Sequence, residues 1–154
     1  MGIIEKNVSL NIINHPSQNF DERPVDSNIE ILVVHYTGLK TLQEAMDILV
    51  HPMSKVSSHY LISETGEIYC LVEETKRAWH AGVSYWRGVT DVNGNSIGIE
   101  LENPGHEFGY RAFQQLQMEA LIALCHDILS RHPIPARNIV GHADVAPQRK
   151  QDPG

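Results

Sequence analysis

Apolar residues along the chain recur in patterns that predict β-strands. Residues 29–38 form an almost continuous β-branched run that ends at a glycine, which indicates the central strand of a sheet, buried on both faces. Two further apolar runs, 57–63 and 67–72, flank Gly66 and are typical of a β-hairpin. Residues 96–104 alternate between apolar and polar or small side chains, which predicts a half-buried strand.

Other segments have the periodicity of helices. Thr41 is a candidate N-cap with Glu44 three residues on, and the apolar residues that follow predict a helix covering one face of the sheet. Residues 113–131 predict the longest helix, which Pro133 stops. Its predicted apolar face comprises Leu116, Ala120, Leu121, Leu124, Cys125 and Ile128, with Gln117 as a polar exception. A last strand begins at Ile139. The order strand, helix, hairpin, strand, helix, strand predicts an α/β fold, a single mixed central β-sheet flanked by α-helices.

The length and charge of the chain narrow the class of protein. At 154 residues it has the size of one ordinary domain. Residues 1–28 are polar and rich in turns, so we expect a lead-in packed on a domain that spans 29–154. No apolar run is long enough to cross a bilayer, which excludes membrane insertion. The net charge is -7 and the basic residues are scattered, which argues against nucleic acid as a partner. We expect a monomer.

The compartment stays open. The first residues lack the basic start and long apolar stretch of an export signal, but a chain whose leader had been removed would look the same. Cytoplasm and the periplasm or cell envelope are therefore both compatible with the sequence. Cys70 and Cys125 lie in apolar contexts and form no CxxC pair, so we expect buried free thiols.

Two histidines and an aspartate follow or end predicted strands. His142 comes directly after the last strand, Asp152 lies in the loop beyond it, and His35 sits near the end of the central strand. A catalytic zinc uses three such ligands and leaves a fourth position open. Because strand ends are where α/β sheets place ligands, the three side chains form a candidate zinc site. The alternative is that His142 is a hydrogen-bonded histidine and Asp152 a turn former before proline.

Hydrolysis at such a site would also need a group that moves protons. Glu100 lies on the polar face of its strand and fits that need, with Glu102 as the alternative two residues along the same face. A solvent-facing pair of glutamates is the other interpretation. Lys150, two residues before Asp152, is positioned to bring positive charge to a developing oxyanion, although by itself it reads as a surface lysine.

The segment 77–88 predicts a loop that holds both tryptophans, Trp79 and Trp86, together with His80. Loops this aromatic often line ligand grooves. Hydrophobic packing is the alternative role for the two tryptophans.

Five blocks of the sequence, in order, resemble the zinc-dependent N-acetylmuramoyl-L-alanine amidases of the type 2 amidase and peptidoglycan-recognition superfamily. The blocks are Val34-His35-Tyr36-Thr37, Ser57-Ser-His59-Tyr60-Leu-Ile, Ala78-Trp79-His80-Ala-Gly82, Ser96-Ile-Gly-Ile-Glu100-Leu-Glu-Asn103 and Gly141-His142-Ala-Asp144 through Lys150-Gln-Asp152-Pro-Gly154. They span most of the chain. Residues 19–24 also resemble the lead-in of bacterial members.

The resemblance implies hydrolysis of the amide between N-acetylmuramic acid and L-alanine, in bacterial peptidoglycan or its muropeptide fragments. It implies Zn2+ on His35, His142 and Asp152, assistance to the attacking water by Glu100, and oxyanion stabilisation by Lys150. It further implies that the substrate groove is lined by Trp79, His80 and Arg149. Arg149 would meet a peptide carboxylate through its fork of donors. His59 resembles a position near the site, with a structural, hydrogen-bonded role as the alternative.

Two other functions stay open at this point, a noncatalytic peptidoglycan-binding module and a zinc peptidase that cuts within the stem peptide. An aspartate as third ligand, together with Glu100 and Lys150, favours the bacterial amidases over a pure recognition module. Relatives usually continue beyond the position of Gly154, so the resemblance also raises the expectation of a domain truncated at its C-terminus.

Overall fold

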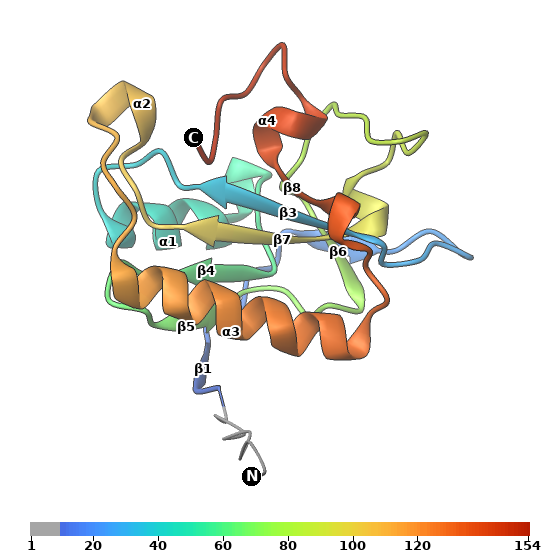
Figure 1. Cartoon of the computed structure of the whole chain (residues 1–154), viewed down its shortest axis with the longest axis horizontal. Coiled ribbons are helices and arrows are strands. Elements are labelled where there is room, and N and C mark those ends of the chain that lie inside the picture. Colours follow the sequence, from blue (N-terminus) through green and yellow to red (C-terminus); the bar gives the residue numbers. More distant parts are fainter. Residues whose placement is uncertain (1–9) are drawn as a thin grey trace, which may run out of the picture.

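The computed structural model describes residues 10–154, and the part of the lead-in at 1–9 lies outside the described residues. A six-stranded sheet in the order β1-β5-β4-β7-β3-β8 forms the centre of the domain (Figure 1). Its strands are β1 (Ile12–Asn14), β3 (Ile31–Tyr36), β4 (Tyr60–Ile62), β5 (Ile68–Cys70), β7 (Ser96–Leu101) and β8 (Ile139–Gly141). A second, two-stranded sheet pairs β2 (Phe20–Glu22) with β6 (Lys76–Ala78).

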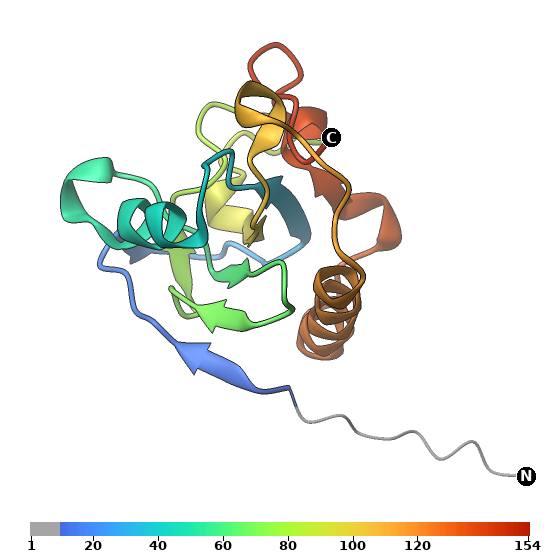
Figure 2. The ribbon, with the colours of Figure 1, turned by 90° about the vertical axis from the view of Figure 1, so that its left-hand side faces the viewer.

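Helices cover both faces of the six-stranded sheet. The helices are α1 (Leu42–Val50), α2 (Gly105–Phe108), α3 (Gln115–Arg131) and α4 (His142–Val145), with 3-10 turns at Pro52–Ser54, Asn93–Asn95 and Ala136–Asn138. Figure 2 shows α1 and α3 on opposite sides of the sheet. The predicted fold class, a mixed sheet flanked by helices, is confirmed. Within residues 10–154, none of the helices has the length and apolarity to cross a membrane.

The sheet is mixed because its strands run in both directions. β3 pairs in parallel with both β7 and β8, and β7 pairs in parallel with β4. β5 runs antiparallel to β4, so the predicted hairpin around Gly66 is confirmed. Since β3, β7 and β8 are parallel, their C-terminal ends meet at one edge of the sheet. Residues at those three ends are therefore brought together whatever their separation in sequence.

The face under α3 holds the largest apolar cluster. Leu32 of β3 and Ile97, Ile99 and Leu101 of β7 pack there against Leu124 and Ile128 of α3. Leu116, predicted for the apolar face, is instead 58% exposed, whereas Gln117 is buried. The Gln117 side chain donates to the carbonyls of Ile62 and Glu102, which satisfies its amide nitrogen at the sheet.

The opposite face is covered by α1 and by the segments around β6. The predicted helix start is confirmed, because the Thr41 side chain accepts the backbone N–H of Glu44. Met46 and Leu49 of α1 pack on Leu61 of β4. Further apolar residues of this face, near β8, are Ile31, Val33, Ala81, Val92, Val140 and Val145.

Three expectations about elements were wrong. The strand at 96–101 is not half-buried. It lies between β3 and β4 inside the sheet, and five of its six residues are buried. The run at 29–38 does form a buried internal strand, but β3 is the fifth strand of six rather than the centre. The segment 77–88 is not loop throughout, since its first residues belong to β6 and pair with β2 of the lead-in. Both cysteines are free, as expected, but only partly buried.

Candidate metal centre

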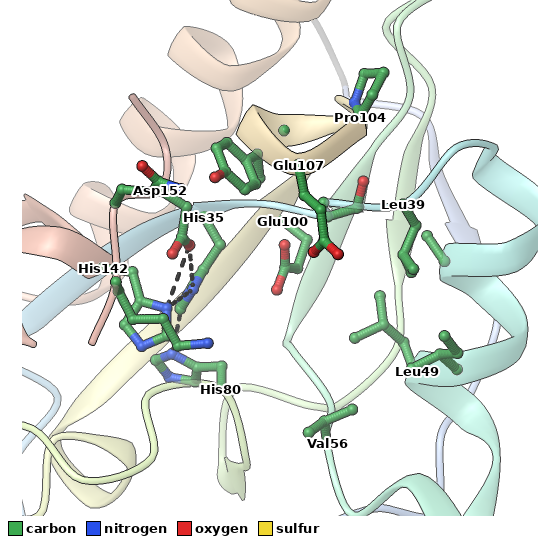
Figure 3. Close-up of a pocket in the computed structure, with 18 of the residues that line it drawn as sticks. His35, Leu39, Leu49, Val56, His80, Glu100, Pro104, Glu107, His142 and Asp152 are labelled. Carbon is green, nitrogen blue, oxygen red and sulfur yellow. Dashed lines mark hydrogen bonds and ion pairs between the residues drawn. The ribbon is translucent and has the colours of Figure 1, made fainter. Parts of the chain in front are cut away.

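Three side chains converge at the C-terminal edge of the parallel strands. His35 lies in β3, His142 follows β8 as the first residue of α4, and Asp152 lies in the loop after α4. His35 Nδ1 is 3.0 Å from His142 Nδ1, and both nitrogens lie 3.2 Å from Asp152 Oδ2. All three residues are buried. Figure 3 shows them pointing at a common point from three separate segments.

Hydrogen bonds on the far side of each imidazole determine which nitrogen faces this point. His142 Nε2 lies 2.9 Å from the carbonyl oxygen of Ala81, which can only accept, so Nε2 carries the hydrogen. His35 Nε2 lies 2.9 Å from His80 Nδ1. Burial lowers the pKa of His35 to about 4, which favours its neutral form. If His35 likewise carries its hydrogen on Nε2, toward His80, both Nδ1 lone pairs face the Asp152 carboxylate.

Two lone pairs and a carboxylate oxygen at mutual hydrogen-bond distance repel one another unless a cation lies between them. Ligand atoms about 2.0–2.2 Å from a tetrahedral zinc ion lie roughly 3.3 Å apart, close to the separations among these three atoms. The donor set, two imidazole nitrogens and one carboxylate, also suits zinc. The residues His35, His142 and Asp152 therefore fit a metal ion of this kind.

Glu100 lies beside this centre on β7. It is the register partner of His35 across the β3–β7 pair, and residues in register point to the same face of a sheet. Its Oε2 atom is buried and has no hydrogen-bond partner among the described residues. Burial and the neighbouring charge of Asp152 raise the pKa of Glu100 well above its usual value, against an opposing effect of Lys150. A carboxyl group in this state is suited to exchange a proton.

Glu102, the alternative acid, occupies a different environment. Its Oε2 accepts the backbone N–H of Glu64 at 2.8 Å, in the turn between β4 and β5. Only Glu100 of the two lines the pocket above the centre. The structure thus separates two residues that the strand pattern left equivalent.

An open pocket of about 420 Å³ lies over the centre. In Figure 3, the apolar side chains of Leu39, Leu49 and Val56 lie on one side of the pocket, and His142 and Asp152 lie on the other. Lys150 is exposed and lines this pocket together with Arg149 and Trp79. A second hollow of about 540 Å³ adjoins it and shares Trp79, His80, Arg149 and Lys150.

The predicted groove residues occupy three kinds of position. Trp79 is half-buried and lines both hollows. His80 lies beneath the centre, hydrogen-bonded to His35. The Arg149 guanidinium donates through Nε and Nη2 to the carbonyl of Val83 and through Nη2 to that of Ala81. The fork of Arg149 is thus engaged by backbone, and its Nη1 is the nitrogen left to meet a ligand.

Comparison with known proteins places this site in a family. The family model described as N-acetylmuramoyl-L-alanine amidase matches residues 25–154. The chain belongs to the N-acetylmuramoyl-L-alanine amidase family. The match includes every residue of the candidate centre and of its pocket.

Individual members of this family are similar over most of the chain. N-acetylmuramoyl-L-alanine amidase AmiD of Escherichia coli is 44% identical over 82% of this chain and 49% of its own length. The 1,6-anhydro-N-acetylmuramyl-L-alanine amidase AmpD of Citrobacter freundii is 38% identical over 90% of this chain and 81% of its own length. The chain therefore spans about half of AmiD and about four fifths of AmpD.

A solved structure of this family has the same fold. It is the complex of E. coli AmiD with the substrate anhydro-N-acetylmuramic acid-L-Ala-D-gamma-Glu-L-Lys, with a TM-score of 0.75 and 41% identity. The similarity covers 86% of this chain and 56% of that one.

Several polar residues around the candidate metal centre were missed by sequence reasoning. The Asn93 side-chain oxygen accepts the backbone N–H groups of both His80 and Ala81, and the Ser96 hydroxyl lies 2.9 Å from His80 Nε2. Their signal in the sequence is weak, because Asn93 sits in an Asn-Gly-Asn turn and Ser96 begins a strand. His59 is buried, and its Nδ1 accepts the backbone N–H of Gly98.

Proposed function

We propose that this chain is a zinc hydrolase that cleaves the amide between N-acetylmuramic acid and L-alanine in peptidoglycan fragments. The observation that carries the proposal is the convergence of His35, His142 and Asp152 next to the unpartnered carboxyl of Glu100. Membership of the amidase family supports the same reaction. Residues 29–154 would form the catalytic domain, acting as a monomer, with the lead-in contributing strands to both sheets.

The metal ligands in this proposal are Nδ1 of His35, Nδ1 of His142 and a carboxylate oxygen of Asp152. Zinc bound there supplies Lewis-acid chemistry, which polarises a carbonyl oxygen and favours the ionisation of water. The far nitrogens of both imidazoles are already bonded to Ala81 and His80, so each ring is held with its lone pair toward the centre.

Glu100 is proposed to carry the protons of the reaction. Its buried oxygen accepts a proton from the attacking water and returns it to the nitrogen of L-alanine as the amide bond breaks. Lys150, an exposed residue that lines the same pocket, brings positive charge to the oxygen of the former carbonyl, where negative charge develops. One residue thus transfers the proton while another stabilises the anion.

The substrate class follows from the pocket and from the relatives. AmpD is named for 1,6-anhydro-N-acetylmuramyl-L-alanine, and the AmiD complex holds an anhydro-muramyl tripeptide. We propose that this chain likewise takes muropeptides, with the groove lined by Trp79 and Arg149 receiving part of the molecule. The Nη1 group of Arg149 is available to a peptide carboxylate.

The test is mass spectrometry of a purified anhydro-muropeptide incubated with the protein, with added zinc and again after chelation. The expected products are an intact anhydro-sugar and a free peptide that begins with L-alanine, and chelation should stop their formation. Fragments cut within the peptide would identify a peptidase instead. An uncleaved substrate that stays bound to the zinc-loaded protein would identify a recognition module. Polymeric peptidoglycan, tested in parallel, determines whether soluble fragments are preferred.

A further inference from the structure

The His80 imidazole lies one layer behind the candidate metal centre and links it to β7. Its Nδ1 is 2.9 Å from His35 Nε2, and its Nε2 is 2.9 Å from the hydroxyl of Ser96. The ring is buried and stands edge-on to His35, with the two planes at 86°. When His35 keeps its Nδ1 lone pair for a metal ion, its Nε2–H donates to Nδ1 of His80, and Nε2 of His80 then carries the hydrogen that reaches the Ser96 hydroxyl. One continuous chain of hydrogen bonds thus runs from the centre into the sheet.

The space for this ring exists because residue 98 is a glycine. A Cβ atom built on Gly98 would lie 2.5 to 2.7 Å from three atoms of the His80 ring. Contacts that short do not occur in proteins, so the ring packs directly on the backbone of β7. This glycine has an ordinary backbone conformation, and close packing against His80 is what its missing side chain permits.

The backbone of His80, like its side chain, is hydrogen-bonded to buried neighbours. The Asn93 side-chain oxygen accepts the N–H of His80 at 3.1 Å and that of Ala81 at 2.8 Å. The carbonyl of Ala81 in turn accepts from Nε2 of His142. Two adjacent residues, His80 and Ala81, therefore supply the acceptors behind both histidines of the centre. A shift of this segment would misdirect both rings at once.

We infer that His80 is a positioning residue for the metal centre, which holds His35 in the tautomer and orientation that present Nδ1 to the ion. The inference rests on the metal site of the proposed function. It differs from the groove role predicted from the sequence, because a buried ring bonded at both nitrogens has no free donor or acceptor to offer a substrate. Hydrogen bonds behind a metal-binding histidine typically contribute about 10- to 100-fold to metal affinity.

The decisive variants differ in whether they keep the acceptor for His35. His80→Phe keeps a flat ring but removes both nitrogens. His80→Asn places an amide oxygen near the position of Nδ1, and His80→Gln extends the amide toward the position of Nε2. Ser96→Ala removes only the far end of the hydrogen-bonded chain. Each protein is examined by competition for Zn2+ with a chromophoric chelator, and by the visible absorption of its Co2+ form, which reports ligand geometry.

We expect His80→Phe to bind Zn2+ about 10- to 100-fold more weakly and to show shifted Co2+ bands. His80→Asn should recover most of the affinity and the wild-type spectrum, and Ser96→Ala should have a smaller effect than His80→Phe. Wild-type affinity and an unchanged spectrum in His80→Phe would overturn the inference. Urea unfolding of the metal-free proteins checks that each is folded.

If His80→Phe does not fold, the comparison of His80→Asn with His80→Gln decides. Weaker Zn2+ binding by the glutamine variant supports positioning through Nδ1, and equal binding by the two contradicts it. A wild-type protein that binds no Zn2+ would overturn the metal site and this inference together. A wild-type protein that binds Zn2+ without cleaving muropeptide would overturn the proposed function alone, since the effect of His80 is read from metal binding.

Discussion

Two glutamates near opposite ends of the parallel strands have opposite chemistry. Glu74 lies by the start of β4, where its two carboxylate oxygens accept from Tyr60, Arg131 and His132 at distances of 2.5 to 3.3 Å. Glu100 lies at the other edge, and its buried Oε2 has no partner among the described residues. Burial opposes ionisation of Glu74, but its hydrogen bonds outweigh that effect and lower its pKa to about 2. Burial of Glu100 is not offset in this way, and its pKa rises.

The contrast between Glu74 and Glu100 distinguishes a structural polar cluster from a candidate functional one. Both regions combine histidine, carboxylate and a cation, so residue types alone do not separate them. The Glu74 carboxylate has donors in Arg131 and His132, which ties the end of α3 to the segment before β6. The two Nδ1 atoms of His35 and His142 and the Asp152 carboxylate instead converge on one point, in the arrangement of metal ligands. Satisfied groups indicate stability, and convergent unsatisfied groups indicate binding.

Removing one of the three proposed metal ligands should have the largest effect. His142→Ala should abolish amide hydrolysis and metal binding, because two ligands do not hold zinc firmly enough for catalysis. Zinc at about 1,000 times its dissociation constant should stabilise the wild-type protein by about 4 kcal/mol, and the variant should lose this increment. Thermal unfolding with and without zinc measures it. An increment that survives in His142→Ala would place the metal elsewhere, and His126→Ala on α3 serves as the control histidine.

The second test concerns the proton-transfer role of Glu100. Glu100→Gln should lower the rate of muropeptide cleavage by about 10²- to 10⁴-fold, because the amide cannot accept the proton of the attacking water. Metal content should be unchanged. Glu102→Gln is the matched control, since Glu102 bonds to the backbone of Glu64 outside the pocket. Similar rate losses in the two variants would contradict the assignment of Glu100.

The third test moves to the other glutamate. Glu74→Ala should destabilise the fold by about 3 kcal/mol, because Arg131, His132 and the hydroxyl of Tyr60 lose their shared partner. Urea unfolding measures the loss. Activity per folded molecule should not change, since Glu74 lies outside the pocket. A variant that is stable but inactive would show that the contrast between the two regions is mistaken.

The smallest expected effect is a pH dependence. The pKa of Glu74 is lowered from an ordinary value near 4.5 to about 2, so its stabilising effect is present above pH 4.5 and is lost as the pH falls toward 2. That shift corresponds to roughly 3 kcal/mol. The difference in unfolding free energy between the wild type and Glu74→Gln should therefore shrink over this range, because effects of other carboxylates are common to both proteins. If the difference in unfolding free energy does not change with pH, the hydrogen bonds of Glu74 do not lower its pKa in the folded protein.

The local patterns of the chain were enough to predict its main elements. The apolar runs at β3 and β4–β5, the capped helix α1 and the long helix α3 are confirmed, because each depends on residues close together in sequence. The burial of single positions was less predictable. Leu116 is exposed and Gln117 buried because the carbonyls of the sheet, distant in sequence, give the glutamine amide its partners.

The positions of His35 and His142 at strand ends, and of Asp152 in the following loop, could be predicted from the sequence alone. Hydrophobic runs mark where strands stop, and polar side chains placed there are exposed to a common edge. Only the tertiary structure decided that Glu100 rather than Glu102 faces that edge, and that His80 lies behind His35. These facts depend on the register of β7 against β3 and on close packing over Gly98, which are contacts between residues far apart along the chain. The pattern of apolar residues specifies the helices and strands locally. Strand pairing and side-chain packing then determine which of several similar side chains come into contact.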